Sequence, residues 1–209
     1  MIKERLGHRI DGWIHTLFPF LFWRPLNPDV LTLIGTGVAG ASGWAFAEGQ
    51  PVWAGLLLLA GGFFDLVDGV IARHFGISTR FGGFLDSSMD RVVDMLAMVG
   101  LIVFYAREAS SAGVLLCTAI LVGTILTSYA KARAELVIPR MPGGLLERGE
   151  RIGLLAAGSI LGILWPILWV LAVGTLVTAG QRFFHAYHAM GRLDRADSTA
   201  HENGEKGEP

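Results

Sequence analysis

Cysteine is almost absent from this sequence, whose 209 residues include a single one, Cys117. One cysteine cannot form an internal disulfide, and its position in an apolar run indicates a buried core thiol. A charge imbalance is absent too, because 17 lysines and arginines face 18 aspartates and glutamates and leave a formal net charge of −1. The composition therefore gives no sign of nucleic-acid binding, which usually shows as a clear excess of positive charge, and we expect no such partner.

Charge is also missing from long stretches of the chain. Sixteen uncharged residues run from Gly49 to Phe64, 52% of all residues are hydrophobic, and the mean hydropathy is +0.51. Several such runs approach or exceed the ~20 residues that cross a bilayer as a helix. We therefore predict one integral membrane domain. The charged N-terminal segment, MIKERLGHRIDGW, precedes the first long apolar run, so no cleavable signal peptide is expected.

The apolar runs predict six membrane-spanning helices. The last apolar stretch, 152–181, would be ~45 Å long as one helix, well beyond a ~30 Å hydrocarbon core, and Pro166 offers a break. A hairpin there puts every lysine and arginine except Arg107 on the cytoplasmic side, as the positive-inside rule expects. The first four spans are expected at 29–47, from about 52 into the Asp65 region, from about 84 to before Arg107, and from about 112 to 135.

The two ends of the chain differ from this apolar middle. Residues 1–23 show apolar positions at helical spacing between charged ones, which predicts an amphipathic helix in the membrane interface, with a soluble docking helix as the alternative. The expected fold is all-α, an integral membrane domain of residues 1–193 with that interfacial helix and six transmembrane helices over 28–190. Residues 194–209 are polar and predict a disordered tail.

Four aspartates interrupt the apolar pattern. Asp65 and Asp68 are three residues apart, and Asp86 and Asp90 are four apart, so each pair shares one face of a helix. Four close carboxylates repel one another unless a cation neutralises them. Oxygen ligands suit Mg²⁺, Mn²⁺ or Ca²⁺, and the lack of histidine and cysteine among them disfavours zinc. The plainer interpretation is a set of interfacial charges on a cytoplasmic loop.

Small residues and arginines accompany the aspartates. Gly69 and Ala72 follow Asp68 by one and four positions, and small residues permit close approach of a ligand or a helix. Arg73 and Arg80 add positive charge for phosphate oxygens. Together with bound metal, these features predict a site for a pyrophosphate compound and two-metal phosphoryl chemistry.

The whole pattern over residues 65–90, D-x2-D-G-x2-A-R-x8-G-x3-D-x3-D, resembles the complete signature of the CDP-alcohol phosphotransferase family. The resemblance implies a phospholipid-biosynthesis enzyme that transfers a phosphatidyl group from CDP-diacylglycerol to an alcohol and releases CMP. It also implies Mg²⁺ or Mn²⁺ in a two-metal site, contact with membrane lipid and a homodimer. The enzyme would be a multi-pass protein of the cell inner (cytoplasmic) membrane, with its active site facing the cytoplasm.

The resemblance also assigns roles to individual residues. The metal ligands would be Asp65, Asp68, Asp86 and Asp90. Asp90 would in addition be the catalytic general base, which fits the need to remove a proton from the attacking hydroxyl. The CDP group would be bound by Asp65, Asp68, Gly69, Ala72, Arg73 and Gly82.

A second group of charges bears on the acceptor. Lys131, Arg133, Arg148 and Arg151 are expected at the membrane level of the aspartates, where they suit an acceptor carrying its own phosphate. Ordinary positive-inside anchoring is the plain alternative. The segments SYAKARAE and ERGER resemble the phosphatidylinositol phosphate synthase branch of the family, which implies inositol phosphate as the acceptor. Glycerol phosphate is the main rival, and an unphosphorylated alcohol such as serine or inositol fits the cations less well.

Two further points stay open at this stage. Asp94 lies one turn beyond Asp90 on the same helical face but outside the signature, so we expect it to support the site or the fold. A transporter that uses intramembrane carboxylates is the alternative of a different class. It would place aspartates deep in discontinuous spans, whereas here they gather at one membrane face.

Overall fold

The structure, a computed structural model, describes residues 27–205 and the side chains of residues 27–195. This part of the chain is all-helical, as predicted, and contains no strand. The predicted interfacial helix at 1–23 lies outside the described residues. The helices are α2 (Pro28–Ala47), α3 (Pro51–His74), α4 (Arg80–Arg107), α5 (Ser111–Ala134), α6 (Arg148–Ile160) and α7 (Leu164–Glu205).

Four of the described helices are long and apolar enough to cross a membrane: α2, α3, α5 and residues 164–195 of α7. The helix α4 has 28 residues, but its segment 80–94 carries Arg80, Asp86, Asp90, Arg91 and Asp94. The helix α6 has only 13 residues, or ~20 Å, which is short of a ~30 Å hydrocarbon core. A multi-pass membrane protein is therefore supported, while the count of six spans stays a prediction.

The last apolar stretch is a pair of helices, as its length predicts, but its turn lies before the expected position. Helix α6 ends at Ile160, and Gly162 has a φ of 71°, a left-handed conformation that glycine adopts without strain. Pro166 lies in the first turn of α7, where a backbone N–H has no partner within the helix and its loss costs little. The proline therefore lies in the first turn of the last helix, and the turn between the two helices is at Gly162.

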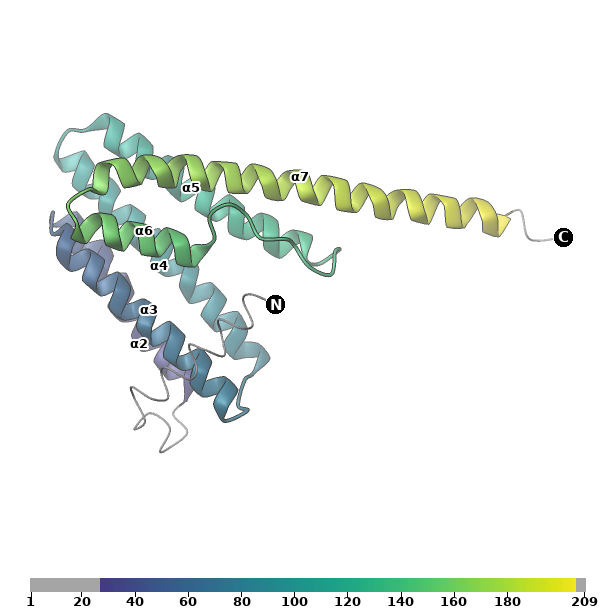
Figure 1. Cartoon of the computed structure of the whole chain (residues 1–209), viewed down its shortest axis with the longest axis horizontal. Coiled ribbons are helices and arrows are strands. Elements are labelled where there is room, and N and C mark those ends of the chain that lie inside the picture. Colours follow the sequence, from purple (N-terminus) through teal and green to yellow (C-terminus); the bar gives the residue numbers. More distant parts are fainter. Residues whose placement is uncertain (1–26, 206–209) are drawn as a thin grey trace.

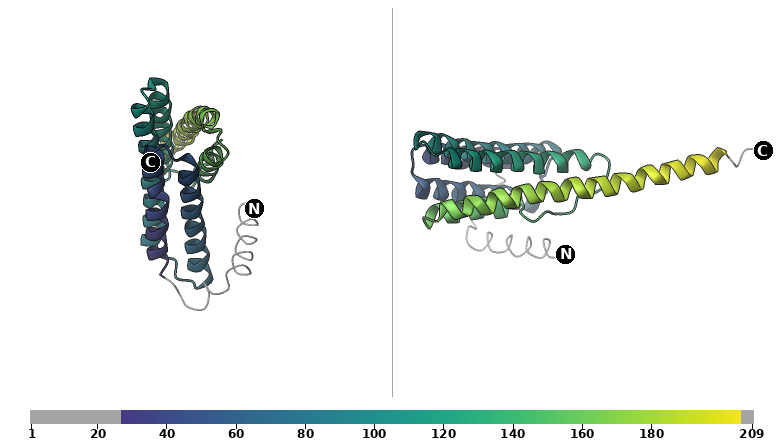
Figure 2. Two further views of the ribbon diagram at one scale, coloured as in Figure 1. Left: turned by 90° about the vertical axis from the view of Figure 1, so that its left-hand side faces the viewer. Right: turned by 90° about the horizontal axis from the view of Figure 1, so that it is seen from above.

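Helix α7 is by far the longest element and continues past the ends of its neighbours (Figures 1 and 2). Its 42 residues correspond to ~63 Å. The sequence predicts a disordered polar tail from Asp194 onward, whereas the helix extends to Glu205. Between Asp194 and Glu205 no proline interrupts the chain, and the only glycine is Gly204, next to the last helical residue. Nothing earlier in that segment therefore forces an end.

The principal contacts between the helices close a ring: α3 packs on α2 and α6, α2 on α4, α4 on α5, α5 on α7, and α7 on α6. Each helix from α2 to α7 gives a buried residue to the main apolar core, among them Phe46, Leu58, Leu101, Leu116, Leu155 and Leu168. Across this ring, Asp90 and Asp94 of α4 contact Arg148 and Arg151 of α6.

Glycines set how closely α3 and α4 approach α2. A methyl group added to Gly61 would overlap Ala39, and one added to Gly100 would overlap the backbone of Gly43. Small residues at such crossings allow membrane helices to pack backbone against backbone. This close packing brings the carboxyl end of α3 beside the amino end of α4, where the four signature aspartates lie.

Candidate metal and phosphate site

Three of the predicted metal ligands meet at one end of the helix ring. Carboxylate oxygens of Asp65, Asp68 and Asp86 lie within 4.8 Å of one another. The short loop between α3 and α4 makes this possible, because Gly76 turns the chain with a φ of 63°. Thr79 then begins α4 by accepting a 2.8 Å hydrogen bond from the Gly82 N–H. A set of carboxylate oxygens at this spacing fits a hard divalent cation.

Asp68 has a partner that sequence reasoning missed. The Thr32 hydroxyl, on α2, donates a 2.6 Å hydrogen bond to Oδ2 of Asp68, and both side chains are buried. This bond fixes the orientation of one carboxylate, as supporting hydrogen bonds do around metal ligands. No motif marks Thr32, because a single threonine in an apolar span is common, and 36 positions separate it from Asp68.

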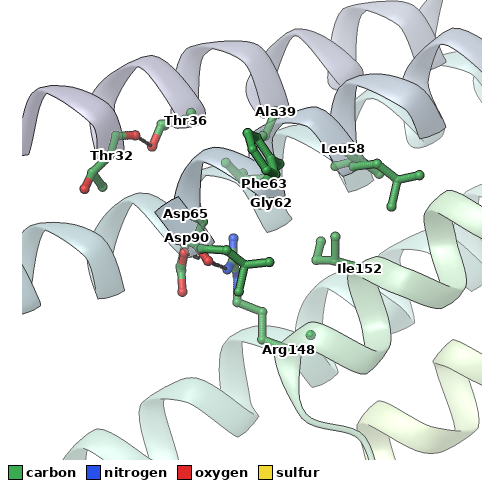
Figure 3. Close-up of a pocket in the computed structure, with 16 residues that line it drawn as sticks. Thr32, Thr36, Ala39, Leu58, Gly62, Phe63, Asp65, Asp90, Arg148 and Ile152 are labelled. Atoms are coloured by element: carbon green, nitrogen blue, oxygen red, sulfur yellow. Dashed lines mark hydrogen bonds and ion pairs between the residues drawn. The ribbon is translucent and has the colours of Figure 1, made fainter. Parts of the chain in front are cut away.

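Arg148 joins the aspartates from the start of α6 (Figure 3). Its Nη1 lies 2.8 Å from Asp90 Oδ1 and 3.4 Å from Asp65 Oδ2. A capping box between Glu147 and Glu150 fixes the beginning of this helix. Arg148 is a predicted acceptor-phosphate residue, and the structure shows that it also contacts the aspartate cluster, defined here as Asp65, Asp68, Asp86 and Asp90.

Two cavities flank the aspartate cluster. The larger, about 330 Å³, has Asp65, Asp90 and Arg148 at its polar end and continues along an apolar lining from α2 and α3 (Figure 3). We call it the apolar cavity. The second, about 240 Å³, lies toward the loop between α3 and α4 and is called the loop cavity. The loop cavity is lined by predicted CDP-binding residues Asp68, Gly69, Ala72, Arg73 and Gly82, and also by Asn27, Asp29, Ser78 and Thr79.

A third cavity, about 150 Å³, is lined mainly by charged residues and is called the cation cavity. It brings together three of the four predicted acceptor-phosphate residues, Lys131, Arg148 and Arg151. Arg133 is exposed and is not among its lining residues. Arg182, which the sequence analysis did not select, lines it from α7.

The arginines of the cation cavity have unused donors. Arg151 and Arg182 are each 8% exposed. Nη1 of Arg182 donates a 2.6 Å hydrogen bond to the Thr127 carbonyl. Nε of Arg182, and Nε and Nη1 of Arg151, have no hydrogen-bond acceptor within the described part of the chain. Buried cationic donors without acceptors are costly. Five basic side chains against three carboxylates also make the lining of this cavity net positive, which favours an anionic ligand.

With the geometry established, comparison with known proteins decides the family. The family profile of CDP-alcohol phosphatidyltransferases matches residues 26–189. The chain belongs to this family. Its membership confirms the predicted enzyme class, a metal-dependent transferase of phospholipid biosynthesis, and gives no support to the transporter alternative.

Two relatives within the family are similar to this chain over most of their length. Over 177 residues the chain is 38% identical to phosphatidylinositol phosphate synthase of Mycobacteroides abscessus, covering 80% of each protein. Over 160 residues it is 35% identical to archaetidylinositol phosphate synthase of Methanothermobacter thermautotrophicus, covering 76% of this chain and 78% of the relative.

Solved structures of Mycobacterium tuberculosis phosphatidylinositol phosphate synthase have the same fold. The structure with CDP-DAG bound matches with a TM-score of 0.72 at 29% identity, covering 88% of this chain and 94% of the other. The complex with manganese and citrate matches with a TM-score of 0.71 at 29% identity, covering 87% and 88%. Manganese in this relative's structure is consistent with a divalent-metal site formed by the carboxylate oxygens of Asp65, Asp68 and Asp86 in this chain.

Proposed function

We propose that this enzyme transfers the phosphatidyl group of CDP-diacylglycerol to inositol phosphate and releases CMP. The observation that carries the proposal is the cation cavity, which adjoins the aspartate cluster through Asp90 and Arg148. An acceptor that bears a phosphate supplies the buried donors of Arg151 and Arg182 with an anion. Glycerol phosphate meets the same requirement and is the second candidate, whereas free inositol or serine leaves those donors unused.

The donor substrate is assigned to the other two cavities. The apolar cavity suits the diacylglycerol part, since its lining is mostly aliphatic and aromatic away from Asp65 and Asp90. The cytidine diphosphate part is assigned to the loop cavity beside the aspartates. Residues proposed to bind it are Asp65, Asp68, Gly69, Ala72, Arg73 and Gly82.

The aspartate cluster is proposed to hold two ions of Mg²⁺ or Mn²⁺. When bound, such ions neutralise the pyrophosphate and stabilise the attacking and leaving oxygens. The protein contributes ligand oxygens and their orientation: Asp65 and Asp68 project from α3, Asp86 and Asp90 from α4, and Thr32 fixes Asp68.

Asp90 is proposed as the general base. It lines both the apolar cavity and the cation cavity, so donor and acceptor would meet at its carboxylate. The acceptor hydroxyl oxygen attacks the phosphorus that carries the diacylglycerol, the bond from this phosphorus to the CMP oxygen breaks, and Asp90 takes the hydroxyl proton. Arg148, 2.8 Å from Asp90 Oδ1, orients that carboxylate and favours its ionised form, which partly offsets the cost of burying its charge.

The proposed setting is a homodimer in the cell inner membrane, with six spans, both termini inside and the site facing the cytoplasm. Support comes from the cations of the site, which share one end of the bundle with the aspartates.

Cysteine labelling tests this topology, because the native Cys117 is buried and should react little with a thiol reagent. Gln50→Cys and Glu108→Cys should react with a membrane-impermeant thiol reagent from outside, and Ser198→Cys only after permeabilisation. Protection of the first two from outside would contradict this topology.

An acceptor screen tests the proposed reaction. The purified enzyme, CDP-diacylglycerol and Mg²⁺ or Mn²⁺ are combined with inositol phosphate, glycerol phosphate, inositol or serine, and CMP release is followed. Inositol phosphate should give the highest kcat/KM, and excess EDTA should stop the reaction. If free inositol reacts as well as its phosphate, the cation cavity does not bind the acceptor.

A further inference from the structure

One buried carboxylate near the site is outside the family signature. Asp94, on α4, lies one turn beyond Asp90 and is only 7% exposed. Its Oδ2 accepts a 3.4 Å hydrogen bond from Nη2 of Arg151, and its Oδ1 lies 3.7 Å from Nε of Arg148. An ionised carboxylate buried this deeply is stable only with such partners, so Asp94 and Arg151 belong to one charge network.

Asp94, Arg148 and Arg151 all line the cation cavity, and Arg151 is the residue of this network that is proposed to bind the acceptor. It lines the cation cavity, and two of its three guanidinium nitrogens have no hydrogen-bond acceptor in the described part of the chain. The third nitrogen is the one that Asp94 holds. An arginine that binds a phosphate at the wall of a cavity needs its rotation fixed, because its long side chain otherwise samples many rotamers.

We propose that Asp94 is a positioning residue for the acceptor: it holds Arg151 by Nη2 and so fixes the guanidinium group at the wall of the cation cavity, where it meets the acceptor phosphate. The inference rests on the proposed function of the cation cavity. It assigns to Asp94 an effect on acceptor binding that a purely structural ion pair would not have. The contact with Arg148 is longer and forms no hydrogen bond, so Arg151 is the main target.

Four variants of the full-length enzyme test this role. They are Asp94→Asn, Arg151→Gln, the double variant, and Met98→Leu as a packing control. Met98 lies one turn further along α4, is 4% exposed and lines the same small void as Asp94 and Arg151. Leucine replaces methionine at nearly equal volume. For each variant, KM for inositol phosphate, KM for CDP-diacylglycerol, kcat and Tm are measured.

The positioning role predicts a selective effect. Asp94→Asn should raise KM for inositol phosphate about tenfold or more, the scale of one lost charge-assisted hydrogen bond, with KM for CDP-diacylglycerol changed less than about twofold. Arg151→Gln should raise KM for inositol phosphate at least as much. The double variant should resemble Arg151→Gln, since Asp94 then has nothing left to position. Met98→Leu should leave both KM values unchanged.

The outcomes separate the two proposals. If Arg151→Gln raises the acceptor KM and Asp94→Asn does not, the positioning role is wrong while the cation cavity stands. If Arg151→Gln has no effect, the cavity assignment fails and the positioning role fails with it. Asp94→Asn leaves Arg151 buried without its carboxylate and can fail to fold, in which case the double variant decides. An acceptor KM in the double variant about tenfold above that of Arg151→Gln would overturn the proposal.

Discussion

The aspartate cluster and the cation cavity meet at Asp90 and Arg148 but have opposite electrostatic needs. The cluster gathers carboxylates whose mutual repulsion is only partly offset by Arg148. The cavity gathers five basic side chains and three carboxylates, and buried nitrogens of Arg151 and Arg182 have no acceptor in the described part of the chain. One region thus calls for cations and the other for an anion. Each half of the site therefore needs its own ligand, and the proposed reaction centre lies at Asp90 and Arg148, which belong to both halves.

The largest expected effect comes from the residue that both regions share. Asp90→Asn removes the proposed general base and should lower kcat by about 10² to 10⁴-fold, because the amide keeps the shape of the carboxylate but accepts no proton. CDP-lipid binding and Tm should change little. Glu108→Gln, at the far end of the same helix, is the matched control. Near wild-type turnover of Asp90→Asn would remove Asp90 from the mechanism.

The next prediction separates the cation cavity from its surroundings. Arg182→Gln should raise KM for the phosphorylated acceptor by about 10- to 150-fold, since a charge-assisted hydrogen bond contributes ~1.5–3 kcal/mol. Arg133→Gln should change it less than about twofold, because Arg133 does not line the cavity. Kinetics with inositol phosphate and with free inositol measure both. Equal effects of the two substitutions would mean that overall positive charge, and not the cavity, attracts the acceptor.

The same contrast explains what the sequence predicts well. The four aspartates lie at spacings of three and four on two helices joined by a short loop, so local geometry fixes their faces. The basic residues of the cation cavity come from α4, α5, α6 and α7, and no local spacing relates α7 to α5. Lys131 and Arg133 are two positions apart, which puts them on different sides of α5. Of these two, Lys131 lines the cavity and Arg133 does not, while Arg182 lines it without having been selected from the sequence.

The fold likewise has features that the sequence predicts and features that it does not. Helix existence follows from apolar runs and from the length of the 152–181 stretch, whose split into α6 and α7 the structure confirms. The position of that turn does not follow, because proline is as compatible with the first turn of a helix as with a break. The role of Thr32 could not be predicted from the sequence for a related reason. Its role depends on the packing of α2 against α3, which glycines such as Gly61 permit.

A smaller effect is expected at this hydroxyl. Thr32→Val keeps the side-chain shape but removes the hydrogen bond to Asp68. Loss of such a supporting contact typically weakens metal binding about 10- to 100-fold, so the Mn²⁺ concentration for half-maximal activity should rise on that scale, while KM for inositol phosphate stays the same. Thr118→Val is the control, since its exposed hydroxyl bonds only to the Val114 carbonyl within α5. An unchanged Mn²⁺ requirement would show that Asp68 needs no support from α2.

The smallest effect on activity is expected from removing the end of α7, because this segment follows all residues assigned to the aspartate cluster and the cation cavity. The part of α7 near Ala186, Ala189 and Met190 packs against Ile138 and Met141. This contact supports the loop that leads from α5 to α6 and its arginines. Residues beyond Arg195 are polar and follow all residues assigned to the site, so deletion of residues 196–209 should change kcat/KM less than about twofold, the usual range for surface changes.

A shorter chain provides the matched comparison for this deletion. Ending the chain after Gln181 removes Arg182 together with the apolar contact to the loop, and activity toward inositol phosphate should fall at least as far as in Arg182→Gln. Both chains are compared by kcat/KM and by Tm in the same detergent. A loss of tenfold or more on deleting residues 196–209 alone would mean that the far end of α7 contributes to the enzyme. The proposed boundary of the catalytic domain at residue 193 would then be too early.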